Sequence, residues 1–301
     1  MSWIPPDGVW PTMITPFTAS GKIDRKGLDA LIEWYREAGV AGLFAVCQSS
    51  EMFALSRAER VALARYCVEA ADGLPVVASG HISDSISEQC DELNEIAATG
   101  IDGLVFVSNR TAAEDESDDV WIERTARVVE SLSSIPLGVY ECPYPYKRLI
   151  TDKTLNWMLD TGRFVFVKDT SCDIEIIGAR LVQAEGQVLR VFNANTRTLL
   201  ASLRLGAAGY SGVMANFHPQ FYVRLCRDWN RGGFDADGLA EYLTDASEIE
   251  KHSYPMIAKE YLKRIGVPIE PYWRKDPTKA GFTAEEEAFL SRLLRSDAER
   301  R

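Results

Sequence analysis

One lysine in this sequence lies where an amine could act as a nucleophile. Lys168 follows the apolar residues 164–167, which read Phe-Val-Phe-Val. A free lysine amine has a pKa of about 10.4, so roughly one in a few thousand is neutral at neutral pH. Partial burial disfavours the charged form and gives proteins an amine that attacks carbonyl substrates. The alternative is a structural ion pair of Lys168 with Asp169 or Glu141.

A tyrosine occupies the matching place in the preceding apolar run. Tyr140 lies near the end of residues 137–141. If both runs are adjacent parallel strands, Tyr140 and Lys168 open into the same end of the sheet. A phenol there can pass protons to and from a carbinolamine and a substrate hydroxyl. The alternative is a tyrosine that only fills the top layer of the interior.

A polar turn follows the second apolar run. Gln48-Ser49-Ser50-Glu51 offers hydroxyl and backbone N–H groups that can hold a small carboxylate, although such polar loops are also common without any ligand. The glycine-rich residues 206–212 lack the lysine of a phosphate-binding loop and precede a strand-like run. They indicate tight turning instead of a phosphate site.

The elements that must position these residues alternate regularly along the chain. Short apolar runs rich in Val, Leu and Phe are typical of parallel strands buried on both faces. Eight strand-then-helix units predict a closed (β/α)8 barrel, a TIM barrel, with its site at the C-terminal ends of the strands. The eight runs cover residues 9–17, 42–46, 75–79, 103–107, 137–141, 164–168, 188–193 and 209–213.

Amphipathic segments between the runs predict eight barrel helices, at residues 24–38, 56–70, 85–99, 118–132, 152–160, 174–184, 196–205 and 219–230. Two of them open on a predicted capping box, Ser56 with Glu59 and Ser85 with Glu88. The remaining sequence predicts three more helices, at 236–250, 254–265 and 284–295. We therefore expect a barrel over residues 1–233 that carries the site, and a helical extension of the same domain over 234–301.

Composition excludes several classes of function. The chain has 301 residues and a net charge of −11, which repels the phosphates of nucleic acids and anionic membrane surfaces. No apolar run approaches the roughly 20 residues of a membrane helix, and the first residues do not resemble a signal peptide. Six cysteines without a CxxC pair indicate reduced thiols, hence a cytoplasmic protein. Three scattered histidines argue against a metal site.

Several of these segments, in order, resemble the dihydrodipicolinate synthase/N-acetylneuraminate lyase family over essentially the whole chain. Residues 8–17 look like the family's opening strand. Cys47-Gln48-Ser49-Ser50-Glu51 lies where the family has Gly-Thr/Ser-Thr-Gly-Glu. Tyr140-Glu141-Cys142-Pro143 lies where it has Tyr-Asn-x-Pro, and Lys168-Asp169-Thr170-Ser171 matches the strand end that carries the Schiff-base lysine.

The resemblance implies a role for each matching residue. Lys168 would form an imine with pyruvate or a related 2-oxo acid, and Tyr140 would shuttle protons. Gln48 and Ser49 would hold the carboxylate, Thr170 would line the substrate channel, and Ser211 would contribute a backbone carbonyl near the imine. The family also implies a homotetramer that needs no metal or organic cofactor.

The sequence departs from the family at several positions. Cys47 and Ser50 replace two glycines, Gln48 replaces the first hydroxyl residue, and Ala194 replaces another glycine. Residues 108–111 lack the tyrosine that the synthases donate to a neighbouring subunit. Pro145 stands where the synthases carry an arginine for the second substrate. These differences argue against a lysine-biosynthetic synthase.

The sequence therefore predicts a class I lyase, an aldolase or a dehydratase, acting on a 2-oxo acid or sugar acid through Lys168. Arg110, Lys147 and Arg148 are candidates to bind a second carboxylate or a polar tail, with surface charge as the alternative. The other hypotheses are a condensation of pyruvate with an aldehyde, a non-catalytic barrel that binds a 2-oxo acid, and a metal-dependent class II aldolase. The few histidines disfavour the last of these.

Overall fold

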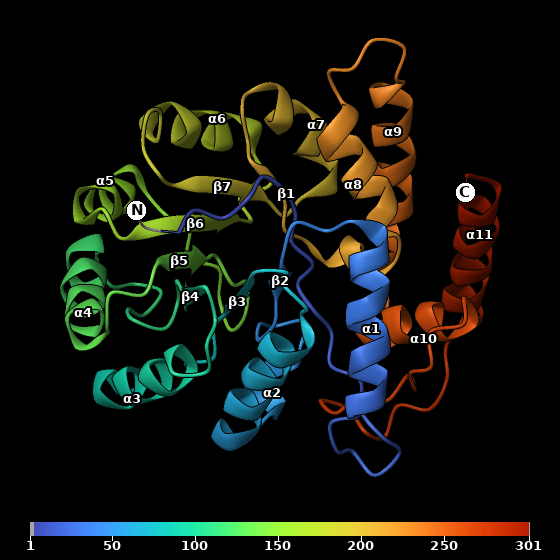
Figure 1. The fold of residues 1–301 in the computed structure, drawn as a ribbon, viewed down its shortest axis with the longest axis horizontal. Coiled ribbons are helices and arrows are strands. Elements are labelled where there is room, and N and C mark those ends of the chain that lie inside the picture. Colours follow the sequence, from blue (N-terminus) through green and yellow to red (C-terminus); the bar gives the residue numbers. More distant parts are fainter. Residues whose placement is uncertain (1–2, 301) are drawn as a thin grey trace.

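A parallel barrel surrounded by helices makes up most of the molecule. The computed structural model describes residues 3–300, and its strands and helices alternate around a common centre (Figure 1). The eight predicted strands are all present. They are β1 Gly8–Val9, β2 Leu43–Phe44, β3 Val76–Ala78, β4 Gly103–Val107, β5 Leu137–Tyr140, β6 Phe164–Asp169, β7 Arg190–Asn193 and β8 Gly209–Tyr210.

The strands pair in parallel in the order β1-β8-β7-β6-β5-β4-β3-β2. The first and last strands of that series meet just beyond β1, where Thr12 forms a parallel bridge to Phe44. The backbone N–H of Met13 donates to the carbonyl of Phe44 at 2.9 Å. These contacts close the (β/α)8 barrel, which confirms the predicted fold.

β1 and β8 are shorter than predicted because their chains approach each other closely, and a proline follows soon after β1. β1 ends at Val9, before Pro11, and residues 10–17 run on as buried irregular chain. Where β1 meets β8, a Cβ on Gly209 would lie 1.9 Å from the carbonyl oxygen of Gly8, and the φ of Gly209 is 151°. Only glycine fits there.

Eight helices cover the outside of the barrel close to their predicted positions. They are α1 Arg25–Ala38, α2 Arg57–Ala70, α3 Ile86–Ala97, α4 Asp118–Ser131, α5 Asp152–Thr161, α6 Ile174–Gln183, α7 Thr196–Arg204 and α8 Pro219–Asp228. The capping box at Ser56 is confirmed in both directions. At Ser85 only half of it forms: the side chain accepts from the backbone N–H of Glu88, without a return bond from the glutamate.

The C-terminal extension folds against one side of the barrel. It contains α9 Ala236–Ala246, the 3₁₀ helix η3 Ser247–Lys251, α10 Met256–Arg264 and α11 Ala284–Arg300. α9 packs on α7 and α8, and α10 and α11 lie beside each other at the edge of the molecule (Figure 1). The predicted helix 236–250 was wrong in its last turn, which tightens into η3.

Aromatic rings fill the interior of the barrel below the strand ends. Phe166 stacks on Phe192, with ring centroids 4.6 Å apart, and meets Trp10 edge-on at 5.5 Å. Side chains two residues apart on a strand point to the same face, so Lys168 extends from β6 above the ring of Phe166. The lysine therefore stands on an apolar floor.

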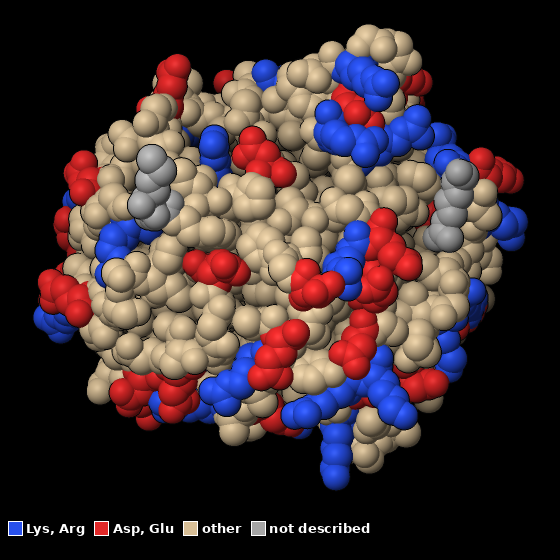
Figure 2. Space-filling model, in the orientation of Figure 1, with Lys and Arg blue, Asp and Glu red and all other residues tan. Residues whose placement is uncertain are grey.

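The face of the molecule seen in Figure 2 carries charges of both signs. Acidic and basic side chains lie there in small groups among larger uncharged areas. Among residues 3–300, no helix is both long and apolar enough to cross a membrane. The same residues contain no group of three or more His, Cys, Asp or Glu side chains placed to hold a metal ion.

Candidate active site

A cavity of about 690 Å³ opens at the C-terminal ends of the strands. Six of the candidate site residues line it: Gln48, Ser49, Tyr140, Lys147, Lys168 and Thr170. Further lining comes from strand ends and loops of the barrel (Glu51, Phe53, Tyr144, Cys172, Ala194, Asn195, Gly212) and from the C-terminal extension (Glu250, Lys251, Tyr254, Trp273, Arg274, Lys275).

Lys168 is the buried amine of this cavity. Its side chain is 4% exposed, and its Nζ lies 4.1 Å from the centre of the Tyr140 ring. Burial lowers its pKa from 10.5 to about 8, with Cys47, Cys142 and Glu141 opposing the shift. Among residues 3–300, Nζ makes no hydrogen bond or ion pair. At neutral pH roughly one lysine in ten is therefore a free amine.

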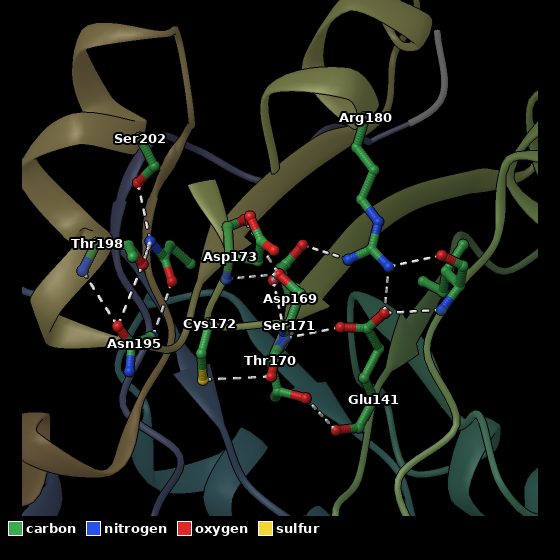
Figure 3. A network of polar contacts seen from close by, with 12 residues as sticks. Glu141, Asp169, Thr170, Ser171, Cys172, Asp173, Arg180, Asn195, Thr198 and Ser202 are labelled. Carbon is green, nitrogen blue, oxygen red and sulfur yellow. Dashed lines mark hydrogen bonds and ion pairs between the residues drawn. The ribbon is translucent and has the colours of Figure 1, made fainter. Parts of the chain in front are cut away.

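The two carboxylates beside Lys168 are bound by an arginine instead (Figure 3). Arg180, from α6, places its guanidinium between Asp169 and Glu141. Its Nη1 donates to Asp169, and its Nη2 donates to Glu141 at 2.6 Å. Both carboxylates are fully buried. The alternative in which Lys168 pairs with Asp169 or Glu141 is therefore wrong.

Thr170 ties β6 to β5 on the far side of the same network. Its backbone N–H donates to the Glu141 carboxylate at 2.7 Å, and its hydroxyl donates to the Glu141 carbonyl at 2.7 Å. In the β5–β6 ladder, Tyr140 and Lys168 are direct partners. The network thus holds the phenol and the amine side by side, as the sequence predicted.

Tyr140 is a proton donor in this arrangement. Its hydroxyl donates to Oε1 of Gln48 at 3.2 Å. Burial raises its pKa well above the ordinary value of 10, and neighbouring thiols add to the effect. The phenol is therefore neutral at physiological pH and has a proton to give.

The turn after β2 presents side chains to the cavity more than backbone groups. The N–H groups of Ser50 and Glu51 donate within the turn, to the carbonyls of Cys47 and Gln48. The Ser50 hydroxyl also bonds both backbone groups of Cys47. The amide nitrogen of Gln48 makes no hydrogen bond to another residue in 3–300. It is free to donate to a ligand. The Ser49 hydroxyl, which donates to the Thr12 hydroxyl at 3.2 Å, can also donate to a ligand if it gives up that bond.

The C-terminal extension contributes residues that the sequence analysis missed. Lys259, fully buried on α10, donates to the Glu51 carboxylate at 2.7 Å and to the carbonyl of Tyr272 at 2.7 Å. Glu51 also accepts from the backbone N–H of Lys275 at 3.0 Å, so this pair holds residues 273–275 in the lining of the cavity, which Tyr254 and Glu250 share. Only contacts between residues some 200 positions apart place them there, so no local pattern could have identified them.

Two of the cationic residues predicted to bind substrate, Arg110 and Arg148, lie outside the cavity lining. The guanidinium of Arg110 points away to the loop after β3, where it donates to the carbonyl of Ile82 and to Asp84 at 2.6 Å. Arg148 likewise donates to Asp118 at 3.1 Å. The hypothesis that Arg110 binds substrate is corrected accordingly. Lys147 does line the cavity, but its Nζ donates to the Thr170 carbonyl at 2.7 Å.

Ser211 is buried directly behind the cavity wall. Its N–H donates to the carbonyl of Asn193 at 2.9 Å, and its hydroxyl finds no partner within the described chain. The next two residues, Gly212 and Val213, line the cavity. The position is consistent with a backbone contribution to the site and leaves the Ser211 side chain out of it.

Known proteins resemble this chain in sequence and in fold. The model of the dihydrodipicolinate synthetase family matches residues 5–294. The chain belongs to this family. The 4-hydroxy-tetrahydrodipicolinate synthase of Methanococcus maripaludis is 24% identical over 87% of this chain and 86% of its own length. The probable 2-dehydro-3-deoxy-D-pentonate aldolase YjhH of Escherichia coli K12 is 26% identical over 88% and 89%.

Solved structures share the fold. YagE, a prophage protein of the family from Escherichia coli K12 solved in complex with pyruvate, has a TM-score of 0.86 and 24% identity. The match covers 96% of this chain and 98% of YagE. Membership confirms the predicted family, fold and class of chemistry: the chain is a class I enzyme of the lyase and synthase type that works through a Schiff base.

Proposed function

We propose that this protein cleaves a 4-hydroxy-2-oxo acid to pyruvate and an aldehyde, through an imine on Lys168. The observation that carries the proposal is a lysine buried on an apolar floor whose two neighbouring carboxylates are held by Arg180. Within the described part of the chain the amine of Lys168 forms no ion pair, and its lowered pKa makes the free amine available. The same imine would serve a dehydratase, in which a hydroxyl leaves instead of a carbon fragment.

Imine formation follows from the positions of the amine and the phenol. The neutral Nζ of Lys168 adds to the ketone carbon, and its proton passes to the developing alkoxide. Tyr140, which is a donor in the resting site, then protonates the carbinolamine hydroxyl so that it leaves as water. The resulting iminium accepts the electron pair of the bond that breaks next.

The carboxylate of the 2-oxo acid is proposed to bind at the turn after β2. The amide of Gln48 and the hydroxyl of Ser49 can donate to its oxygens, and Thr170 lines the opposite wall. The carbonyl of Ser211 is proposed to lie near the imine. The scheme requires no metal or organic cofactor, so we expect turnover to persist in the presence of a chelator.

Product analysis tests this function. The protein would be incubated with 2-dehydro-3-deoxy-D-pentonate, the substrate named for its Escherichia coli relative, and pyruvate release would be followed by reduction to lactate. In the reverse direction, pyruvate would be supplied with glycolaldehyde or either glyceraldehyde. Pyruvate release or adduct formation supports the proposal. Release of water without pyruvate would indicate a dehydratase, and pyruvate binding without any turnover would indicate a non-catalytic barrel.

The alternative function is a condensation of the synthase type, since synthases are among the relatives. It would use the same imine with an amino-acid semialdehyde as the second substrate. The sequence has Pro145 where the synthases have an arginine, which disfavours that substrate. Consumption of pyruvate with aspartate semialdehyde, but with no hydroxyaldehyde, would support the synthase.

Removing the Tyr140 hydroxyl should slow the reaction without preventing the protein from folding. We expect Tyr140→Phe to lower kcat by about 10²–10³-fold, because general acid–base groups contribute on this order. The matched control is Tyr222→Phe, which removes another fully buried hydroxyl, one that bonds Thr196 at 2.7 Å outside the cavity. A Tyr140→Phe enzyme as active as this control would exclude the phenol as proton shuttle.

We also propose the homotetramer and the cytoplasmic setting that the family resemblance implies. Two large apolar side chains near α6 and α7 are exposed, Val182 at 74% and Leu205 at 53%, and both line one hollow. All six cysteines are free thiols, as a reducing compartment requires. Light scattering should give the mass of a tetramer, and Val182→Glu with Leu205→Glu should reduce it. A monomeric wild-type protein would contradict the assembly.

A further inference from the structure

Glu250 brings a carboxylate into the active-site cavity from outside the barrel. It lies in η3, the 3₁₀ turn that ends α9, and lines the cavity together with Tyr254 and Lys168. η3 packs against η2 (Val213–Asn216), the short helix that follows β8. Within residues 3–300 the carboxylate accepts no hydrogen bond and forms no ion pair. A half-buried carboxylate without a partner is available to a ligand.

The charges around Glu250 suit a group that takes and returns a proton. Burial raises its pKa from 4.5 to about 7. Lys168 from β6 opposes that shift, Glu248 adds to it and Lys251 opposes it. Its charge also acts on the phenols of Tyr210 in β8 and Tyr222 in α8. At neutral pH the carboxylate and the carboxylic acid are both populated, as general acid–base catalysis needs.

The depth of Glu250 in the cavity indicates which part of a substrate it meets. Lys168 is 4% exposed at the bottom, whereas Glu250 is half-buried, nearer the mouth. A 2-oxo acid joined to Lys168, with its carboxylate at Gln48 and Ser49, must extend its remaining carbons toward the mouth. Tyr140 approaches the lysine from β5, and Glu250 approaches from the β8 side, beyond β7. The two groups therefore flank the substrate.

We infer that Glu250 is the catalytic base for the carbon–carbon bond and accepts the proton of the substrate's C4 hydroxyl. This inference rests on the proposed function of the site. As the O–H proton moves to the carboxylate, C4–O becomes the aldehyde carbonyl and the C3–C4 bond breaks. Its electron pair enters the iminium, giving an enamine on Lys168. The enamine takes a proton at C3, and water hydrolyses the imine to pyruvate.

Tyr140 is less suited to this step. The phenolate that the imine step leaves on Tyr140 regains a proton from solvent before cleavage, because burial raises the pKa of this phenol well above 10. It acts earlier, when water must leave the carbinolamine. The site thus has one group that donates for imine formation and a second that accepts for bond cleavage. The preferred substrates are accordingly 2-oxo acids with a hydroxyl on C4.

Glu250→Gln tests the assignment because it keeps the shape and removes the base. The control is Glu287→Gln on α11, whose carboxylate pairs with Arg264 at 2.8 Å and does not line the cavity. Two steps are measured: borohydride trapping with pyruvate alone, and cleavage of 2-dehydro-3-deoxy-D-pentonate together with condensation of pyruvate with glycolaldehyde and both glyceraldehydes.

We expect Glu250→Gln to trap pyruvate as wild type does and to lose at least about 10²-fold in kcat for cleavage and condensation. The control should match wild type in both. Cleavage by Glu250→Gln within threefold of wild type would overturn the assignment, as would a wild-type enzyme that traps pyruvate but handles none of these substrates. A wild-type enzyme that traps no pyruvate would instead reject the proposed function itself.

Discussion

Replacing Lys168 with methionine is expected to lower kcat for pyruvate release at least about 10⁴-fold, the order seen when a covalent nucleophile is removed. The fold should survive because, within residues 3–300, Lys168 has no ion-pair partner that would be left unpaired. Methionine also matches the length of the apolar stem. Far-ultraviolet circular dichroism and urea denaturation check the fold, and the coupled assay checks kcat.

The pH dependence of the same step follows from the lowered pKa. Only the neutral amine attacks a carbonyl, so kcat/KM for the 2-oxo acid should rise with pH and level off above about 8. Lys168→Arg keeps a cation at this position but cannot supply a neutral amine, so it should be as inactive as the methionine variant. A Lys168 variant that retains a tenth of wild-type turnover would refute the imine mechanism.

The second large effect is expected at Arg180, which touches no substrate. Arg180→Met leaves the buried carboxylates of Glu141 and Asp169 without a cation. Breaking such a buried pair costs about 3–5 kcal/mol in the free energy of unfolding. The control is Arg197→Met, which breaks an ion pair to Glu248 with side chains 67% and 38% exposed, where a change below about 1 kcal/mol is expected. Urea denaturation measures both.

Arg180 also controls the state of the amine. The charge of Glu141 already acts on Lys168, and without the arginine to compensate that charge it would favour the ammonium form of the lysine more strongly. The pH at which kcat/KM levels off should therefore move upward in Arg180→Lys. This conservative variant keeps the charge but loses the two-pronged contact. Wild-type stability in Arg180→Met, together with an unchanged pH profile in Arg180→Lys, would show that the contacts of Arg180 with Glu141 and Asp169 neither stabilise the fold nor affect the amine of Lys168.

The barrel could be predicted from the sequence because each of its units is a local pattern. Buried parallel strands read as continuous apolar runs, and polar segments such as 47–51 and 168–171 fall where those runs end. Once the order of strands is known, Tyr140 and Lys168 must be neighbours. The outer strands were less predictable, because their lengths depend on prolines and on the close contact between Gly8 and Gly209.

The rest of the site depends on long-range contacts that no local pattern encodes. Nothing near Lys259 in the sequence indicates that it reaches Glu51, nor does anything near Glu250 indicate that it faces Lys168. Arg180 lies on an ordinary amphipathic helix, where an arginine is usually solvated. For Arg110 the prediction was wrong in the opposite direction, because a residue predicted to bind substrate does not line the cavity. It follows a strand end, but its guanidinium donates to Ile82 and Asp84 and so points away from the cavity.

Borohydride trapping with pyruvate tests the central claim most directly. The protein is reduced in the presence of pyruvate, and the adduct is located by intact-mass measurement and peptide mapping. Lys147→Arg serves as the control, because the ammonium group of Lys147 also lies at the β6 end of the cavity, where it donates to the Thr170 carbonyl. The imine mechanism predicts one reduced pyruvate adduct per chain, on Lys168, in both wild type and this control. A folded protein that gains no adduct, or gains one on another lysine, would contradict it.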